Sequence, residues 1–135
     1  MIIRLNMKSD IPIYVQLRNE IVLGIGRGEL KCGEMLPTVR QMAEDIGVNT
    51  MTVNKAYTIL KQEGYIETDR RRGSVVSSQI DLQGDFSAKA EQELTLLIAE
   101  ASLKGMKKED FMQMCEKIYN EMKVTADSQT AFSGI

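Results

Sequence analysis

The chain has 135 residues, of which 43% are hydrophobic and 27% charged, and its formal net charge is −2. This length predicts one domain of ordinary size, or a small domain with an extension. The sequence has no His, the commonest general base, no glycine cluster typical of nucleotide binding and no paired cysteines typical of zinc binding, so we expect neither an enzyme nor a cofactor or metal site.

The first predicted helix covers residues 11–27. Arg18 and Glu20 are expected on its solvent side. Several glycines weaken its last turns, so we expect the helix to fray near Gly28. Its buried stripe recurs at helical spacing and consists of Tyr14, Leu17, Ile21 and Ile25.

Two short helices joined by a tight turn are predicted between residues 38 and 64. Thr38 and Gln41 have the spacing of a capping box at the start of the first helix. Gly47 supplies the left-handed residue that ends this helix, and Asn49 is a strong N-cap candidate for the second. Because so few residues separate the two helices, the turn must be sharp. The pattern predicts a helix-turn-helix, which places its second helix in the major groove of DNA.

The second of these helices has two unlike faces. The alternative to DNA binding is a winged helix used only for protein–protein contact. In that case, the outward face of this helix would carry apolar or acidic residues. The buried face is predicted to hold Val53, Ala56, Tyr57 and Leu60. The outward face instead carries short hydrogen-bonding side chains and one cation, suited to base edges: Thr50, Thr52, Asn54 and Lys55.

A strand-like hairpin follows Gly64. Residues 65–68 and 74–77 are expected to pair, with the turn at residues 69–73. The turn carries Arg70, Arg71 and Arg72 beside Gly73. Alone, this run could be an ordinary charged turn. Directly after a helix-turn-helix, it favours a wing that contacts phosphates or the minor groove.

Motifs spread over roughly residues 10–77 occur together in this chain. They are Ile11-Pro12-Ile13-Tyr14-x-Gln16, Gly33-x-x-Leu36-Pro37-Thr38-x-Arg40, Gly47-Val48-Asn49-x-x-Thr52-Val53-x-x-Ala56-Tyr57 and Glu63-Gly64-Tyr65-Ile66. In combination they resemble the GntR family of bacterial winged-helix regulators, and the short C-terminal remainder resembles its YtrA subfamily. Subfamily members often have proline at the position of Thr50 and a Gly-Lys-Gly wing tip where this chain has Arg71-Arg72-Gly73.

The resemblance implies a mostly helical fold with a small β-hairpin wing, and a DNA-binding transcription regulator that acts as a repressor. It assigns Arg40 as an arginine that leaves the first of the two helices to contact DNA, although on spacing alone Arg40 reads as a surface arginine. The expected partner is a double-stranded DNA operator. The predicted DNA-binding residues are Thr38, Arg40, Asn49, Thr50, Thr52, Asn54, Lys55, Arg71, Arg72 and Gly73.

The net charge of −2 is low for a DNA-binding protein, since phosphate contacts drive affinity. The charge is unevenly divided. Residues 1–78 carry 11 Lys and Arg against 9 Asp and Glu, a net of +2, and residues 79–135 carry 6 against 10, a net of −4. Because binding depends on the local field, the acidic excess in the C-terminal part is compatible with DNA binding by the N-terminal part.

A polar linker is expected at residues 78–86, followed by helices at about 87–104 and 107–123 hinged at Gly105. The two helices carry a strong apolar stripe that they cannot cover by themselves. We therefore expect a homodimer in which the two helix pairs form a four-helix arrangement. The two-fold symmetry of such a dimer predicts a palindromic operator. The alternative is that the stripe packs on the chain's own winged helix. The predicted dimerisation residues are Leu94, Leu97, Ile98, Ala101, Phe111, Met114, Ile118, Tyr119 and Met122.

The predicted organisation is a winged helix-turn-helix at 1–78, a helical dimerisation extension at 79–124 and a disordered tail at 125–135. Cys32 and Cys115 are expected to be free thiols. No apolar run reaches membrane-spanning length and no signal-peptide pattern is present, so we expect a cytoplasmic protein with no membrane partner. An effector of unknown identity would bind between subunits or between the extension and the winged helix, against Met106, Phe111 and Met114.

Overall fold

The structure is a computed structural model that describes residues 3–80 and 84–123. Within these residues, the chain forms helices and a two-stranded antiparallel sheet. The chain divides into two units, Met1–Ile80 and Asp81–Ile135, and each is described by itself. The predicted tail at 125–135 and residues 81–83 of the predicted linker lie outside the described residues. The elements are α1 (Ile13–Gly26), α2 (Val39–Ile46), α3 (Thr50–Gln62), β1 (Ile66–Asp69), β2 (Gly73–Val76), α4 (Phe86–Leu103) and α5 (Lys108–Glu121).

The fold class is confirmed: the chain is mostly helical with a small β wing. Each element begins and ends close to its predicted position. Helix α1 starts after Pro12 and stops at Gly26, two residues before Gly28, whose φ of 79° lies in the left-handed region. Helices α2 and α3 are capped as the sequence indicates, with Gly47 between them at a φ of 72°.

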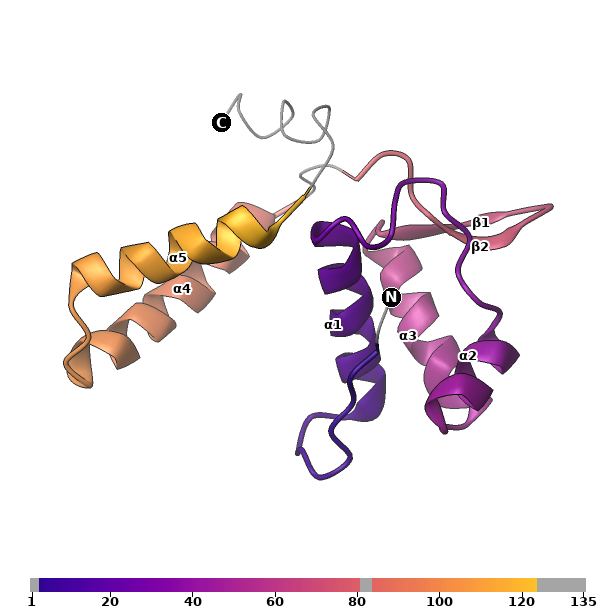
Figure 1. The fold of residues 1–135 in the computed structure, drawn as a ribbon, viewed down its shortest axis with the longest axis horizontal. Coiled ribbons are helices and arrows are strands. Elements are labelled where there is room, and N and C mark those ends of the chain that lie inside the picture. The colour runs from indigo at the N-terminus through magenta and orange to yellow at the C-terminus, as the bar shows by residue number, and fades with distance from the viewer. Residues whose placement is uncertain (1–2, 81–83, 124–135) are drawn as a thin grey trace. The chain divides into compact units, whose positions relative to one another are not determined.

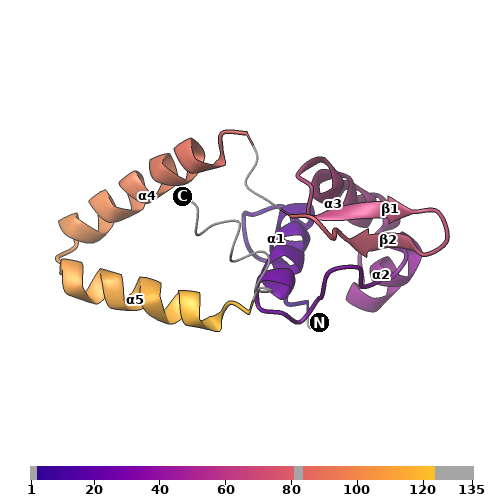
Figure 2. The same ribbon diagram turned by 90° about the horizontal axis from the view of Figure 1, so that it is seen from above.

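The core of the first unit forms where α1, α2 and α3 meet one face of the wing, with α1 and α3 side by side (Figure 1, Figure 2). Of the stripe predicted for α1, Leu17 and Ile21 are fully buried, whereas Tyr14 and Ile25 are partly buried against the core. Burial of this apolar surface is the main stabilising term for the unit. The buried members are Leu17, Ile21, Leu30, Leu36, Met42, Ala43, Val53, Ala56, Tyr57, Leu60, Ile66 and Val76.

Two polar side chains of α1, Gln16 and Arg18, fasten the helix to other segments. Near its start, Gln16 accepts from the backbone N–H of Asn6 at 2.7 Å and donates to the carbonyl of Ile11 at 2.8 Å, which holds the N-terminal segment against the helix. Farther along, Arg18 donates two hydrogen bonds to the carboxylate of Glu63, at 2.9 and 3.2 Å. The prediction that Arg18 faces solvent was therefore wrong in part, because this half-buried ion pair joins α1 to the C-terminal end of α3.

The wing is wider than a hairpin. Strands β1 and β2 pair antiparallel, from Ile66 opposite Val76 to Asp69 opposite Gly73. The other edge of β2 pairs with the segment that precedes α2: the N–H of Gly33 donates to the carbonyl of Val76 and that of Leu36 to the carbonyl of Ser74, both at 2.8 Å. This third extended segment attaches the wing to the rest of the unit.

The second unit is a helical hairpin of α4 and α5, joined at Gly105, which has a φ of 87° (Figure 2). Neither helix contains a buried residue. Its large apolar side chains are exposed, among them Leu103 at 88% and Tyr119 at 78%. None of the helices in the described part of the chain is long and apolar enough to span a bilayer.

Candidate nucleic-acid interface

The α2–α3 turn has a fixed geometry, because both of its ends are capped. Thr38 accepts a hydrogen bond from the N–H of Gln41 at 3.1 Å, one of the two bonds of the predicted capping box. After Gly47, the N–H of Val48 donates to the carbonyl of Ala43 at 3.0 Å. The side-chain oxygen of Asn49 then accepts from the N–H of Thr52 at 2.8 Å and starts α3.

Tyr57 adds a second connection between the two helices. Its side chain is buried in the core as predicted, and its hydroxyl donates to the carbonyl of Pro37 at 2.8 Å, immediately before the N-cap of α2. Burial raises the pKa of Tyr57 above its ordinary value, so the hydroxyl keeps its proton. The start of α2 is thereby held at a fixed position on α3.

The outward face of α3 carries polar side chains along its first two turns, together with one exposed apolar residue, Met51, at 80%. Thr50, Asn54 and Lys55 are exposed, and Thr52 is half-buried. The oxygen of Asn49 accepts the capping bond, and its amide nitrogen, a donor, is not used by that bond. The structure thus brings together the four side chains predicted for this face, with the fifth, Asn49, partly engaged.

Lys55 is held in place by α1. Its ammonium nitrogen lies 4.0 Å from the centre of the Tyr14 ring, a cation–π geometry. The sequence assigns Tyr14 to the core of α1 and Lys55 to the outward face of α3, and the structure makes them a pair. The contact restricts where the cation of this face can reach. The spacing of 41 residues between them gave no signal for it.

Arg40 is exposed in the first turn of α2. Thr38, two residues before it, is also exposed, but its hydroxyl oxygen already accepts the capping bond. The short turn joins the C-terminal end of α2 to the N-terminal end of α3 (Figure 1). Arg40 on α2 and the polar face of α3 are therefore both exposed, on two consecutive helices.

The tip of the wing is built around Asp69. One oxygen of this carboxylate accepts from the N–H of Arg71 at 2.8 Å and from the N–H of Arg72 at 3.0 Å. These backbone bonds, and then the side chain of Arg72, lower the pKa of Asp69 below its usual range. Sequence reasoning missed this role, although an Asp that opens a turn is a known signal for such side-chain-to-backbone bonds.

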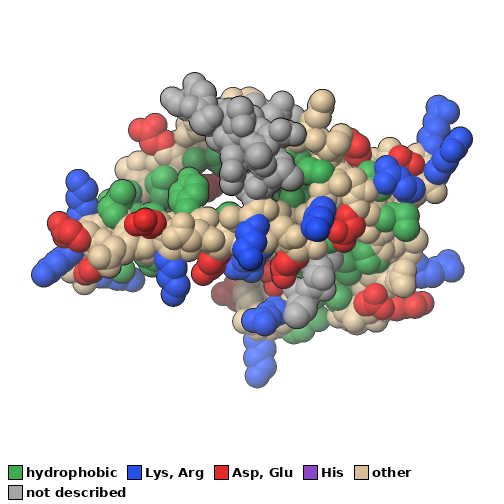
Figure 3. Space-filling model, turned by 45° about the horizontal axis from the view of Figure 1, so that its top comes forward, with side chains coloured by type: hydrophobic (Ala, Val, Ile, Leu, Met, Phe, Trp, Pro, Cys, Tyr) green, Lys and Arg blue, Asp and Glu red, His purple; other side chains and the backbone are tan. Residues whose placement is uncertain are grey.

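The three arginines of the wing differ in their surroundings. Arg70, Arg71 and Arg72 are all exposed, and basic side chains gather at the tip (Figure 3). The guanidinium of Arg72, however, donates to the carbonyl of Gly33 at 2.8 Å and to Asp69 at 3.2 Å. Gly73, with a φ of 81°, follows as the first residue of β2. Arg72 is thus bonded to protein at both of its terminal nitrogens.

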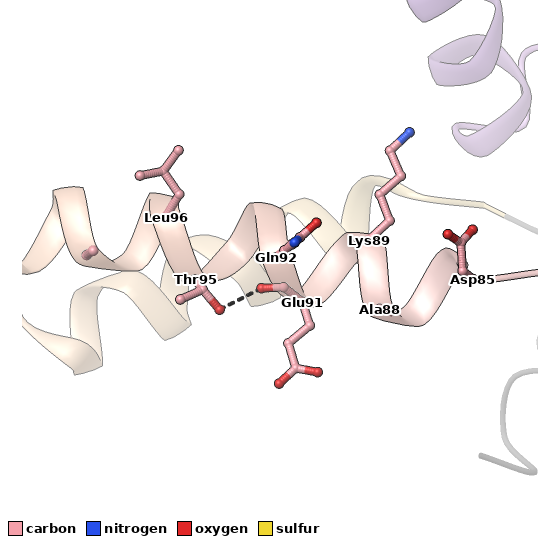
Figure 4. Close-up of a pocket in the computed structure, with 8 residues that line it drawn as sticks. Asp85, Ala88, Lys89, Glu91, Gln92, Thr95 and Leu96 are labelled. Carbon is pink, nitrogen blue, oxygen red and sulfur yellow. Dashed lines mark hydrogen bonds between the residues drawn. The ribbon is translucent and has the colours of Figure 1, made fainter.

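The hairpin offers a second candidate surface, for association. Most side chains predicted for dimerisation are exposed; Ala101, Phe111 and Met122 are half-buried. Helix α4 is apolar on opposite sides, since Leu94 and Leu97 lie on one side and Leu96 and Leu103 on the other at 3.6 residues per turn. The side with Leu96 lines a pocket together with Lys89, Gln92 and Thr95, whose hydroxyl donates to the carbonyl of Glu91 at 2.7 Å (Figure 4).

A groove of about 340 Å³ lies inside the hairpin, beside the α4–α5 turn. The groove is open to solvent and does not form an enclosed cavity. Two of the predicted lining residues, Met106 and Phe111, line the groove. The other lining residues are Ile98, Ala101, Ser102, Lys107, Lys108 and Met112.

Among the described residues, no group of three His, Cys, Asp or Glu side chains is arranged to hold a metal ion. Both cysteines are free thiols: Cys32 is exposed and Cys115 is half-buried.

Comparison with known proteins gives consistent results. Residues 13–76 match the family model described as bacterial regulatory proteins, gntR family. The chain is 34% identical over 124 residues to the HTH-type transcriptional repressor YtrA of Bacillus subtilis, covering 90% of this chain and 95% of that protein. A relative of this kind is a transcription regulator and not an enzyme.

Two solved structures share the fold along most of the chain. A protein described as a transcriptional antiterminator from Listeria monocytogenes superposes with a TM-score of 0.77 at 28% identity, covering 87% of this chain and 90% of that one. YtrA from Sulfolobus acidocaldarius, described as a GntR-family transcription factor, superposes with a TM-score of 0.56 at 34% identity, covering 88% and 97%.

Proposed function

The chain belongs to the GntR family of transcriptional regulators, and we propose that it is a homodimeric repressor that binds a palindromic DNA operator. The observation that carries the proposal is the face of α3: a capped, exposed helix start with three exposed polar residues, Thr50, Asn54 and Lys55. Repression is inferred from the Bacillus subtilis relative, whose name describes a repressor. Because the partner is chromosomal DNA, we assign the protein to the cytoplasm.

In the proposed complex, α3 lies in the major groove with its N-terminal residues at the base edges. Asn54 has the amide that pairs with adenine, and Arg40 has the fork that pairs with guanine. Thr50 and Thr52 supply shorter donors and acceptors, and the wing lies along the neighbouring phosphates. A face used only for protein contact would be apolar or acidic, whereas this one is mainly polar and basic, with Met51 as its single large apolar side chain among Thr50, Thr52, Asn54 and Lys55.

The dimer is inferred from α4. A helix that is apolar on opposite sides needs two partners. One side, with Ile98 and Ala101, borders the groove shared with Phe111 of α5. The other side, with Leu96 and Leu103 exposed at 65% and 88%, fits the same surface of a second copy. These two residues are not among those predicted for dimerisation from the sequence, so the proposed contact on α4 differs from the predicted one. A two-fold pair of hairpins would form a four-helix bundle and present two α3 helices about one turn of DNA apart.

We propose that effector control, where it operates, uses the groove at the α4–α5 turn. Its walls are mainly apolar and it is open on one side, so a second hairpin could complete it. Lys107 and Lys108 at its rim favour a ligand with an anionic group. A ligand bound there would act on the hairpin that joins the two copies, and so on the spacing of their recognition helices.

Selection of bound duplexes from random DNA tests the operator proposal. We expect a palindrome, and affinity for it that falls steeply as salt rises. Arg40→Ala and Asn54→Ala should each cost about 1–3 kcal/mol of binding free energy and relax the preference at one position of each half-site. Lys61→Ala, at the far end of α3, is the matched control. Equal affinity of the Arg40→Ala variant for the selected operator would remove that residue from the interface.

Sedimentation of the full chain tests the dimer. We expect a dimer at micromolar concentration, and monomers when Leu96→Glu places a charge in the proposed interface. Met7→Glu, at a large apolar side chain that is 60% exposed in the first unit, is the control and should leave the dimer intact. A monomeric parent, or a dimer unaffected by Leu96→Glu, would contradict the proposal.

A further inference from the structure

We propose that Arg72 is a positioning residue, which fastens the wing tip to the segment before α2 so that Arg70 and Arg71 are the arginines that meet DNA. This inference rests on the proposed DNA-binding function and assigns different tasks to three adjacent residues of one type. It replaces the prediction that Arg72 itself contacts the phosphate backbone.

The first support is the bonding of Arg72. One terminal nitrogen of its guanidinium donates to the carbonyl of Gly33 at 2.8 Å, and the other lies 3.2 Å from the carboxylate of Asp69. The two partners come from different elements: Gly33 precedes α2 by six residues, and Asp69 ends β1. A planar guanidinium can hold both at once, because its donors form a rigid fork.

The second support is the carboxylate that Arg72 pairs with. Asp69 uses its other oxygen to accept from the N–H groups of Arg71 and Arg72, which fixes the backbone of the turn. Arg72, Asp69 and the turn backbone therefore form one connected set of bonds. The lowered pKa of Asp69 agrees with a carboxylate that receives all of these donors.

The third support is the sheet pairing of Gly33, which lies at the end of β2 remote from the tip. The N–H of Gly33 donates to Val76 of β2, and its carbonyl accepts from Arg72. Gly33 is thus bonded to the hairpin at two places, one in the sheet and one at its tip. The sheet bonds alone leave the turn at residues 70–72 unattached to the rest of the unit. The hydrogen bond from Arg72 to Gly33 attaches it.

An acidic side chain at a surface that meets phosphates is unfavourable by charge alone. Asp69 lies one residue from Arg70 at the tip, so its carboxylate would repel the DNA backbone. The arrangement becomes favourable if the carboxylate shapes the turn and is neutralised locally by Arg72. Removal of the carboxylate therefore distinguishes the two roles of Asp69, because DNA affinity falls if the carboxylate shapes the turn and rises if it is only a nearby negative charge.

The test measures dissociation constants of the full chain for a duplex of scrambled sequence over a series of salt concentrations. If Arg72 positions the tip, Asp69→Ala weakens binding, on the order of fivefold, because the turn must be ordered on binding. If Asp69 is only a nearby negative charge, the same substitution strengthens binding. Tighter binding by Asp69→Ala would overturn the proposal.

Two substitutions of Arg72 distinguish its positioning role from the contribution of its positive charge. Arg72→Lys keeps the charge but not the fork, so we expect it to bind as weakly as Arg72→Ala. Full rescue by lysine would identify a phosphate contact instead. Arg71→Ala should reduce the slope of log affinity against log salt by about 0.9, the value for one lost phosphate contact, and Arg72→Ala should leave that slope nearly unchanged. A reduction for Arg72→Ala and none for Arg71→Ala would reverse the assignment.

The free protein supplies an independent measurement. Titration of the Asp69 carboxyl group by NMR should show its pKa rise part of the way toward the ordinary value in Arg72→Ala, which loses the side-chain bond and keeps the backbone N–H bonds, and stay low in Arg71→Ala. An unchanged titration in Arg72→Ala would refute the bonded tip even if DNA binding is observed. A parent chain that binds no duplex at all would refute the DNA-binding function, while this titration would still report on the tip.

Discussion

The hydroxyl of Tyr57 offers a direct measure of what holds the helix-turn-helix together. Tyr57→Phe keeps the ring, which is 1% exposed, and removes only the hydrogen bond to the carbonyl of Pro37 at 2.8 Å. The carbonyl of Pro37 then loses its partner beside the core. A lost bond that leaves a buried group unsatisfied costs about 1–3 kcal/mol, and we expect the lower half of this range because Pro37 is half-buried.

Thermal unfolding followed by circular dichroism measures the effect. For a unit of 80 residues, about 1 kcal/mol lowers the melting temperature by roughly 4–8 °C. Tyr119→Phe is the matched control, since its side chain is 78% exposed, and it should melt with the parent. If Tyr57→Phe melts at the parent's temperature, the bond to Pro37 contributes nothing and the reasoning fails.

A pH series gives the same residue a second test. Burial holds the pKa of Tyr57 above its ordinary value of about 10, which applies to the unfolded chain. The folded state therefore keeps a proton that the unfolded state loses. This contribution is fully present below about pH 10 and declines as pH rises toward the folded pKa. The parent should lose more stability than Tyr57→Phe above that pH; parallel declines would contradict the burial argument.

Other substitutions probe the turns. Asn49→Ala removes the cap bond to Thr52 and should cost about 1 kcal/mol of unfolding free energy in urea titration, whereas Asn49→Asp should cost less. Gly47→Ala forces a side chain into a φ of 72° and should cost about 1–2 kcal/mol, with lost DNA affinity if the angle between α2 and α3 changes. Asp69, whose pKa is lowered by backbone N–H groups of the wing turn, contributes stability that is present above about pH 4 and is lost as pH falls through its folded pKa. Asp69→Asn should therefore flatten the acid side of the stability profile, and an unchanged profile would be a contradiction.

The helices and the wing could be predicted because their signals are local. Thr38 and Asn49 start helices with side-chain bonds that span three residues, and Gly47 ends a helix by its own conformation. The apolar spacing of Val53, Tyr57 and Leu60 identified the buried face of α3 in the same way. Because the opposite side of the same helix must then face solvent, the polar face could also be predicted. Its candidate DNA-binding side chains lie together on that side.

The contacts between these elements could not be predicted. Arg72 bonds a carbonyl 39 residues away, and Arg18 bonds a carboxylate 45 residues away. Lys55 lies over the ring of Tyr14. Each pair depends on how helices and strands pack, and neither periodicity nor capping signals contain that information. For this reason the sequence indicated a basic wing tip but could not distinguish the tasks of its arginines.

The position of the core along the chain has a consequence for biosynthesis. All of its fully buried apolar residues lie between Leu17 and Val76, so every element they need has been made before α4 is translated. Chains emerge from the ribosome N-terminus first, at about 5–20 residues per second, and domains fold as units. The winged helix can therefore fold as it emerges, before the apolar hairpin is released from the ribosome. Under the proposed dimer, pairing is then the last step of maturation, and its rate depends on how many chains the cell has already produced.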